Sequence, residues 1–454
     1  MSLVYTISRG LTSTVPWPLL LAAAAEGVAG VAVYGYAPLY LRQALGEPRL
    51  TVVTLSLALA SLATFLMAGR WGRWGDRTGR RGPLIATGLA VAAATLAVLP
   101  AARSSTLFIA LLVVTTAFLA AVVPLGVAWL TLRHPDRPGE AASLLYLARS
   151  AGWAVGSFGS GWLAGRWGIA GITAAFWLSG ALALVAGCVV AMAMPRPSRQ
   201  EPGAMALAAE SGTAPAPPST MEERGRGHDG NDRTHTGRLG QGGHGDVRAG
   251  SGAAGDDLAG DRLVEAGRSI WRYPAVVAIA ATVLFTIAGN EAFFAVLGVY
   301  FTEYLAGSSG QIGLTLGIAS VLGVAVMAPA GRLADRWGPE RVFTFGAGGY
   351  LFMYALIVLA QDPLATMAAF ALPLYPFVAT GATGVLSRST PAARRGEAVG
   401  MYEGSAALAA SLGSLIGGLV ADLAGIGRVP LVSSVLVAGG FGVAWRFVLR
   451  RRAE

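Results

Sequence analysis

The chain alternates long apolar segments with short polar connections along almost its whole length. A helix that crosses the hydrocarbon core of a bilayer needs about 20 consecutive apolar residues. Segments of about that length cover residues 17–41, 51–69, 83–102, 106–131, 141–164 and 170–194, and again 275–302, 311–330, 342–361, 364–386, 398–421 and 429–448. This pattern predicts an all-α integral membrane protein, with twelve transmembrane helices in two six-helix bundles.

The long polar stretch between the two halves has a different composition. Residues 195–272 are rich in Gly, Ser, Asp and Arg and have almost no aromatic residues. Such a segment cannot bury enough apolar surface to offset its chain entropy. We therefore predict a disordered cytoplasmic linker at 195–272 between a bundle at 1–194 and a bundle at 273–454. Residues 256–274 have the pattern of a short amphipathic helix on the membrane surface.

Composition supports this topology. Of the 454 residues 54% are hydrophobic and 13% are charged, whereas soluble domains carry roughly 25% charged residues. All 34 basic residues are arginines, and most lie in connections on one side of the predicted helices. The positive-inside rule places that side, with both termini, in the cytoplasm. The net charge of +9 therefore indicates a multi-pass protein of the plasma membrane, with the lipid bilayer rather than nucleic acid as its partner.

Cysteine and histidine offer little chemistry. Cys188 is the single cysteine, and the four histidines lie in predicted connections. A disulfide framework or a thiolate metal cluster is excluded. No nucleophile, base and metal-ligand set can be assembled from the apolar segments, so we expect neither an enzyme nor a bound cofactor or metal.

Two connections repeat the same motif. GRWGDRTGRR (72–81) and GRLADRWGPER (331–341) share the spacing Gly-x-x-x-Asp-Arg-x-Gly. The matching positions are Gly72, Asp76, Arg77, Gly79, Arg80 and Arg81 in the first half and Gly331, Asp335, Arg336 and Gly338 in the second. The chain resembles the major facilitator superfamily, whose signature loop has this pattern. The resemblance implies alternating access to a central site, with the two aspartates in a cytoplasmic gate. The second copy departs from the pattern at Pro339 and Glu340.

A second repeat links the fifth and eleventh predicted helices. Residues 139–161 parallel residues 396–418, and both segments carry closely spaced glycines. Close helix packing is the simplest reading of these small residues. The first segment also resembles the glycine-rich motif of proton-coupled drug antiporters, although Ser157 rather than Pro follows Gly156. The resemblance points to the drug and multidrug efflux branch.

Ionisable side chains inside predicted membrane helices are candidates for the functional site, because they are costly there unless a cavity or a partner stabilises them. The candidates for substrate and proton binding are Glu26, Arg149, Asn290, Glu291 and Glu403. Arg149 requires an anionic partner, and Glu26 in the same half is the one we expect. Each acid has a purely structural alternative, namely a bond to a neighbouring helix.

The two glutamates of the first and seventh helices invite comparison. If Tyr40 and Tyr304 mark equivalent extracellular ends, Glu26 and Glu291 lie at nearly the same depth. A carboxyl group removed from water binds a proton closer to neutral pH, which suits proton coupling.

The resulting hypothesis is a monomeric secondary transporter that exports an amphipathic small molecule in exchange for protons. Aromatic residues at 34, 36, 40, 129, 153, 300 and 402 are candidates for the cavity wall, although packing explains them equally well. A sugar or metabolite transporter is the second hypothesis. A membrane sensor that keeps the fold without transport is the third.

Overall fold

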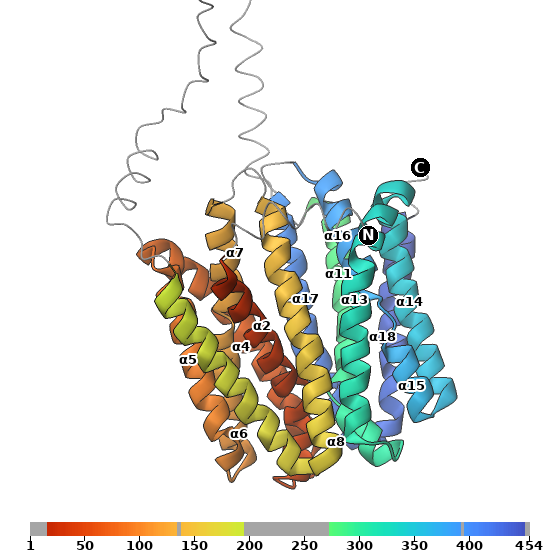
Figure 1. Cartoon of the computed structure of the whole chain (residues 1–454). Helices are drawn as coiled ribbons and strands as arrows, with labels where there is room; N and C mark the ends of the chain where they lie inside the picture. The colour runs from red at the N-terminus through yellow and green to blue at the C-terminus, as the bar shows by residue number, and fades with distance from the viewer. Residues whose placement is uncertain (1–15, 134–137, 195–271, 392–394, 450–454) are drawn as a thin grey trace, which may run out of the picture. The chain divides into compact units, whose positions relative to one another are not determined.

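The computed structural model describes residues 16–133, 138–194, 272–391 and 395–449. Every regular element in these ranges is a helix, and the longest helices run side by side (Figure 1). The predicted linker lies outside the described residues apart from Arg272, and so do Trp271 and most of the predicted surface helix.

The first half contains six membrane-crossing segments, several of them built from more than one element. Its elements are α2 (Trp17–Val31), η1 (Ala32–Tyr36), α3 (Ala37–Gln43), α4 (Leu50–Thr78), α5 (Arg81–Val98), η2 (Leu99–Ala101), α6 (Ser105–Leu119), α7 (Val122–Arg133) and α8 (Pro138–Ala193). The first crossing is continuous from α2 to α3, with the π-helical turn η1 between them.

The second half repeats this order. Its elements are α11 (Pro274–Phe294), α12 (Leu297–Val299), η4 (Tyr300–Tyr304), α13 (Ser309–Trp337), α14 (Pro339–Ala360), α15 (Pro363–Phe370), α16 (Tyr375–Ser389), α17 (Arg395–Ala424), η6 (Ile426–Arg428), α18 (Val429–Val443) and η7 (Ala444–Leu449). Again a π-helical turn, η4, lies near the extracellular end of the first crossing.

Within the described residues, eleven continuous segments are long and apolar enough to cross a bilayer. One of them, Ala142–Ala193, has 52 residues and would measure about 78 Å as a straight helix, far more than the ~30 Å hydrocarbon core. Gly168 interrupts it with φ 55° and ψ −129°, a backbone conformation that favours glycine. Gly171 then packs against the backbone of Leu163, so the chain turns back. This segment crosses twice, and the predicted twelve helices are confirmed.

The repeated glycines bring equivalent helices into close contact. A Cβ atom at Gly156 would lie 2.9 Å from the Cα of Val28, and one at Gly413 would lie 2.8 Å from the Cα of Ala288. Only glycine permits this approach. The first part of α8 therefore packs on α2 as α17 packs on α11, and the repeat in the sequence is a repeat in the packing.

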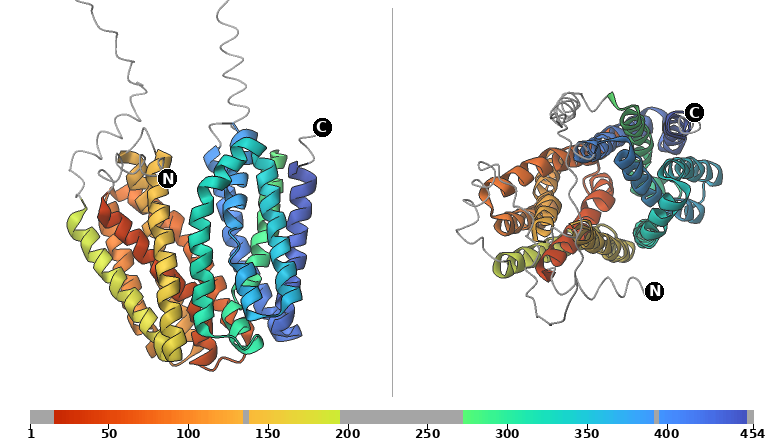
Figure 2. Two further views of the ribbon diagram at one scale, coloured as in Figure 1. Left: turned by 45° about the vertical axis from the view of Figure 1, so that its right-hand side comes forward. Right: turned by 90° about the horizontal axis from the view of Figure 1, so that it is seen from above.

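The two halves meet along two helix pairs, α4 with α17 and α8 with α13. Figure 2 shows these helices between the two groups, and the described parts of both halves belong to one compact unit. The exact division into bundles at 1–194 and 273–454 remains a prediction.

Three helices, α6, α13 and α15, are capped at their extracellular starts by a side chain of their own half. Ser104 Oγ accepts a hydrogen bond from Leu107 N at the start of α6. Asp362 Oδ2 accepts one from Ala365 N at the start of α15. In contrast α4 follows Arg49, whose side chain makes no such bond. The first amide groups of α4 therefore need an acceptor from elsewhere.

Candidate functional site

The first part of the site is an ion pair between α2 and α8. Arg149 donates from Nε to Glu26 Oε2 at 2.5 Å and from Nη2 to Glu26 Oε1 at 3.1 Å. The Glu26 side chain is 10% exposed, whereas that of Arg149 is 38% exposed. The expected ion pair is therefore present. The Arg149 side chain stays partly accessible although the residue lies about 16 Å from the start of α8. Close packing at Gly27 and Gly152 holds the two helices at this distance.

Aromatic side chains lie next to this ion pair. Tyr34 stacks on Trp153 with ring centroids 6.4 Å apart and an interplanar angle of 25°. The Tyr34 hydroxyl is 3.3 Å from Thr64 Oγ1 on α4. Both rings belong to the predicted set of aromatic residues, and the pair offers a flat surface beside charged groups.

The second half contributes a different cluster around Asn290 and Glu291 on α11. The Tyr354 hydroxyl donates to Asn290 Oδ1 at 3.2 Å, and the Asn290 side chain lies close to Glu291. Tyr350 lies within electrostatic range of Glu291. The described residues place no ion pair on Glu291, so its half-buried carboxyl has neutral hydrogen-bonding neighbours.

Glu403 on α17 faces the first half. It lies within electrostatic range of Arg149 and of Tyr146 on α8. Two neighbouring tyrosines, Tyr375 and Tyr402, lie within electrostatic range of it. Glu403 is exposed, and Tyr146 and Tyr375 are 50% and 48% exposed. Accessible polar side chains from the two halves therefore face one another well inside the length of the helices.

The packing repeat corrects the expected depth of the two glutamates. Since Val28 and Ala288 occupy equivalent contacts, Glu26 corresponds to Thr286 rather than to Glu291. Glu291 lies five residues further along its helix, which is about 7 Å nearer the extracellular side. The two acids are not symmetry mates. They occupy different levels of the molecule.

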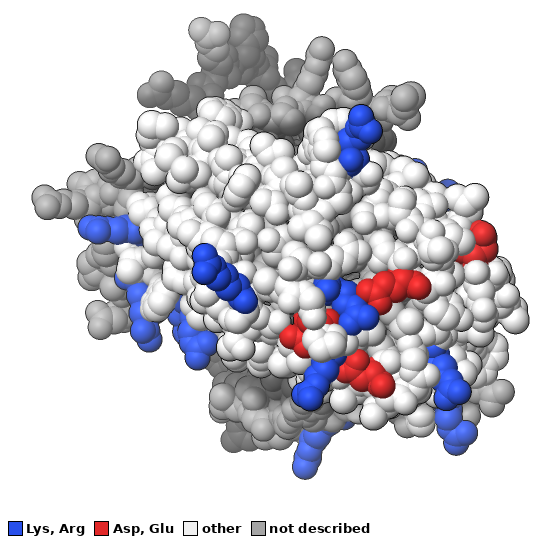
Figure 3. Space-filling model, turned by 90° about the horizontal axis from the view of Figure 1, so that it is seen from below, with Lys and Arg blue, Asp and Glu red and all other residues white. Residues whose placement is uncertain are grey.

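On the extracellular side an ion pair joins the halves. Arg42 of α3 donates to both carboxylate oxygens of Glu303 in η4, at 2.8 and 2.9 Å. The same guanidinium donates to the carbonyl groups of Glu47 and Pro48. Figure 3 shows basic and acidic side chains gathered near the middle of this face.

The missing cap of α4 comes from the other half. Asp422, in the last turn of α17, accepts hydrogen bonds from Leu50 N at 2.8 Å, Thr51 N at 2.8 Å and Thr51 Oγ1 at 2.6 Å. A carboxylate at a helix N-terminus is favoured by the helix dipole. Neither Asp422 nor the Arg42–Glu303 pair was predicted as functional, because each needs a partner from the other half. We call these two contacts the extracellular latch.

Contacts between the halves continue inward from the latch. Ser411 Oγ donates to Ala58 O at 3.1 Å, and a Cβ atom at Gly161 would lie 2.6 Å from the Cα of Gly313. Near the other ends of these helices, Cβ atoms at Gly72, Gly323, Gly331 or Gly400 would meet no neighbour within 4 Å. The described contacts between the halves therefore reach from the extracellular side to the middle of the helices, whereas these four glycines near the arginine-rich side face open space.

The repeated motif lies on the arginine-rich side. Gly79 ends α4 with φ 64°, and Arg81 Nη2 donates to Asp76 Oδ1 at 2.9 Å. In the second copy Gly338 ends α13 with φ 93°, while Asp335 has no ion pair with a described residue. The remaining motif positions Arg77, Arg80, Gly331 and Arg336 flank the same two helix ends. In this conformation neither described aspartate bridges the halves, and their role in a gate remains a prediction.

The comparisons with known proteins agree with this architecture. The family model described as Major Facilitator Superfamily matches residues 19–372 and 279–454. A curated protein of Deinococcus radiodurans named "Putative sugar efflux transporter" is 24% identical over 398 residues, which cover 86% of this chain and 87% of that protein.

Solved structures share the fold at low identity. The bacterial homologue of the human lysosomal transporter Spinster, in an inward-facing and occupied conformation, has a TM-score of 0.67 at 12% identity, with 98% of each chain covered. The xylose transporter XylE from E. coli, in an inward open conformation, has a TM-score of 0.66 at 13% identity, with 95% of each chain covered. The nucleoside transporter NupG has a TM-score of 0.66 at 12% identity, with 94% of this chain and 98% of that chain covered.

Proposed function

Since the chain belongs to the major facilitator superfamily and is therefore a membrane transporter, we propose that it exports a small polyhydroxylated solute across the cell membrane in exchange for protons. The solute binds between the halves, and access alternates as the extracellular latch opens and the cytoplasmic ends close. The aspartates Asp76 and Asp335 then hold the cytoplasmic ends together. The transporter works as a monomer.

One observation supports this proposal above the others. Arg149 and Glu403 come from different halves, interact electrostatically and are both accessible. A solute between them contacts both halves at once, so its binding affects their relative position. The surrounding tyrosine hydroxyl groups both donate and accept hydrogen bonds, which suits a solute with several hydroxyl groups.

The charges favour neutral or cationic solutes over anions. Glu26 neutralises Arg149 through two hydrogen bonds, so Arg149 is not a free anion site. Glu403 and Glu291 then leave the site with an excess of acid. The Deinococcus relative, whose printed name refers to sugar efflux, supports a hydroxylated solute within this range.

Proton coupling is assigned to Glu291 rather than to Glu26. Glu26 is bound on both oxygens by Arg149, which stabilises its ionised form. Glu291 has Asn290 beside it and tyrosines nearby, and these neighbours tolerate either protonation state. Uptake of a proton on Glu291 would remove one negative charge from the site and change its affinity for the solute.

An amphipathic compound is the second candidate substrate. The stacked rings of Tyr34 and Trp153 offer a flat apolar surface beside the acids, and cations bind well to aromatic faces. A transport panel that contains both solute classes separates the two candidates.

The test is transport by purified protein in lipid vesicles with an imposed pH gradient. The panel contains labelled hexoses, pentoses, nucleosides and an amphipathic cation. We expect Glu291→Gln to lose accumulation driven by the gradient, while exchange of labelled for unlabelled solute continues. Glu47→Gln serves as the control, because Glu47 bonds Ser105 at the extracellular surface. Gradient-driven transport that survives Glu291→Gln unchanged would refute the coupling, and an inert panel would refute the proposed classes of solute.

A further inference from the structure

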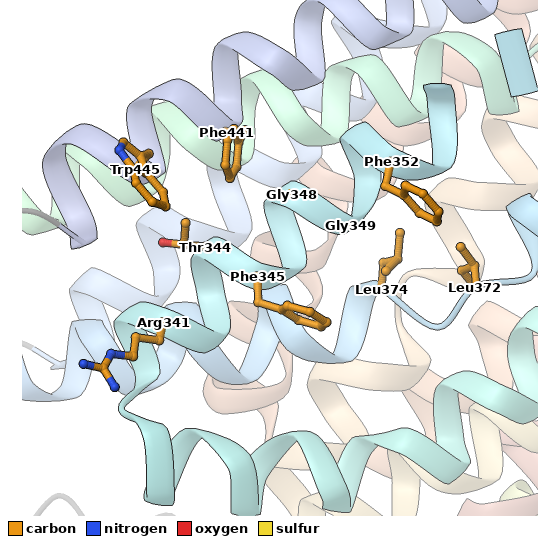
Figure 4. A pocket seen from close by; sticks show the side chains of 10 residues that line it. All are labelled: Arg341, Thr344, Phe345, Gly348, Gly349, Phe352, Leu372, Leu374, Phe441 and Trp445. Carbon is orange, nitrogen blue, oxygen red and sulfur yellow. The ribbon is translucent and has the colours of Figure 1, made fainter. Parts of the chain in front are cut away.

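A groove of about 580 Å³ lies on the second half, outside the candidate site. It runs along one face of α14 and is bordered by η7, α18 and the connection between α15 and α16 (Figure 4). Phe345, Phe352 and Trp445 in its wall are 54%, 60% and 45% exposed. The ring of Phe441 packs closely against Gly348, where a Cβ atom would lie 3.1 Å from it. Its wall is therefore mostly aromatic and apolar.

The length of the groove matches one leaflet of a bilayer. Arg341 and Phe352 mark its two ends on α14, and eleven residues of helix span about 16 Å. Half of a ~30 Å hydrocarbon core is about 15 Å. An extended acyl chain that starts at the cytoplasmic surface would therefore end near Phe352.

The cytoplasmic end of the groove is basic. Arg341 is exposed in the first turn of α14 and makes no ion pair with a described residue. The N-terminus of α14 adds partial positive charge at the same place, while Glu340 in the same turn carries the opposite charge. Trp445 lies towards this end in Figure 4, and tryptophan favours the headgroup level of a membrane. This end therefore suits an anionic headgroup.

The corresponding face of the first half is filled. A Cβ atom at Gly187 would lie 3.2 Å from the Cβ of Leu89, and one at Gly180 would lie 3.2 Å from the carbonyl oxygen of Ala93. The last crossing of that half thus packs directly on α5.

We propose that this groove binds one anionic phospholipid of the cytoplasmic leaflet. Its phosphate lies at Arg341, its glycerol backbone lies at the level of Trp445, and one acyl chain follows α14 past Gly348 to Phe352. The cytoplasmic leaflet is the anionic one, and a basic side chain near it is worth about 1 kcal/mol. The site is separate from solute binding and does not depend on the transported substrate.

To test this, the purified full-length protein is titrated with phosphatidylglycerol or with phosphatidylcholine of the same acyl chains. Bound lipids are counted by native mass spectrometry. We expect phosphatidylglycerol to bind about fivefold more tightly. Arg341→Gln should remove this preference. Arg388→Gln should keep it, because Arg388 is an equally exposed arginine in the last turn of α16 that does not line the groove. Equal effects of the two substitutions, or no preference in the wild type, would overturn the proposal.

A second measurement locates the acyl chain. Phosphatidylglycerol with brominated acyl chains should quench the part of the tryptophan emission that Trp445→Phe removes. Quenching should fall in Gly348→Leu, which fills the groove, provided that circular dichroism shows unchanged helix content. If Gly348→Leu is misfolded, the comparison of Arg341→Gln with Arg388→Gln still decides. Loss of quenching on addition of a transported solute would assign the groove to the solute instead and overturn the proposal.

Discussion

Removing the carboxylate of Asp422 should open the extracellular side. Asp422 is the acceptor for three hydrogen bonds from Leu50 and Thr51, at 2.6 to 2.8 Å. These bonds exist only while the ends of α4 and α17 are together. Any loss of their free energy therefore shifts the equilibrium towards the outward-open conformation.

The structure sets the size of this shift. A charge at a helix N-terminus contributes about 0.3–1 kcal/mol, and loss of a helix cap costs roughly 0.5–2 kcal/mol. Asp422 is exposed, so solvent screening holds its effect near the lower values. Asp422→Asn, which keeps one acceptor and loses the charge, should shift the equilibrium by about 0.3 kcal/mol or less than twofold. Asp422→Ala, which loses charge and cap together, should shift it by about 0.8 kcal/mol or fourfold.

The assay measures the distance between the extracellular ends of the two halves. The exposed single cysteine is first replaced by Cys188→Ser. Spin labels are then attached at Arg103→Cys in the first half and Arg428→Cys in the second, and distances are measured by double electron–electron resonance in nanodiscs. A population at longer distance should grow from wild type to Asp422→Asn to Asp422→Ala.

Asp362→Asn is the matched control. Asp362 also caps a helix through its carboxylate, but the helix is α15 in its own half. This substitution should leave the distance distribution unchanged. An equal shift in the control, or an unchanged distribution in Asp422→Ala, would refute the idea that the cap acts between the halves.

Two further predictions concern the packing of the helices. Arg42→Glu should enlarge the same long-distance population, because Glu303 repels the new carboxylate; the exposed ion pair contributes about 0.2–1 kcal/mol. The double variant Arg42→Glu with Glu303→Arg should restore the wild-type distance distribution. If it does not, the two side chains do not pair directly. Gly152→Ala should lower the melting temperature of the purified protein, because overpacking costs about 1–3 kcal/mol. Gly159→Ala, whose Cβ meets nothing within 4 Å, should leave the melting temperature unchanged or raise it. A lower melting temperature for Gly159→Ala than for Gly152→Ala would contradict the packing of α2 on α8.

The fold followed from local properties of the sequence. The length of an apolar segment and the polarity of its flanking residues can be read from that segment alone. The twelve crossings could therefore be recognised without knowing which helices pack against each other. The turn at Gly168 shows the limit of this approach. Helical residues continue directly on both sides of it, and one glycine with positive φ reverses the chain.

The site was only partly predictable. Glu26 and Arg149 could be singled out because charge inside an apolar helix is costly, and their pairing follows from packing within one half. Tyr350, Tyr354 and Tyr375 gave no such signal, since a tyrosine in an apolar helix fits packing as well as a polar site. The equal depth expected for Glu26 and Glu291 was wrong, because tyrosines near the helix ends do not fix the packing register.

The extracellular latch was missed for a different reason. From the sequence, Arg42 is one of the arginines in connections that indicate the orientation in the membrane. Asp422 directly follows the helix predicted at 398–421, and no basic residue lies close to it in the sequence. Their partners come from the other half of the chain. One local signal was available: α4 follows Arg49 rather than a residue that caps helices well, which indicates that its first amides find an acceptor elsewhere.

The most direct test of alternating access is labelling of Tyr146→Cys, in the Cys188→Ser background, with a membrane-impermeant thiol reagent applied to one side of the membrane at a time. Tyr146 lies beside Glu403 and is half exposed. We predict labelling from the cytoplasmic side only, and labelling from the extracellular side as well once Asp422→Ala is added. Labelling from neither side, or from both sides with the latch intact, would contradict a central site that opens to one side at a time.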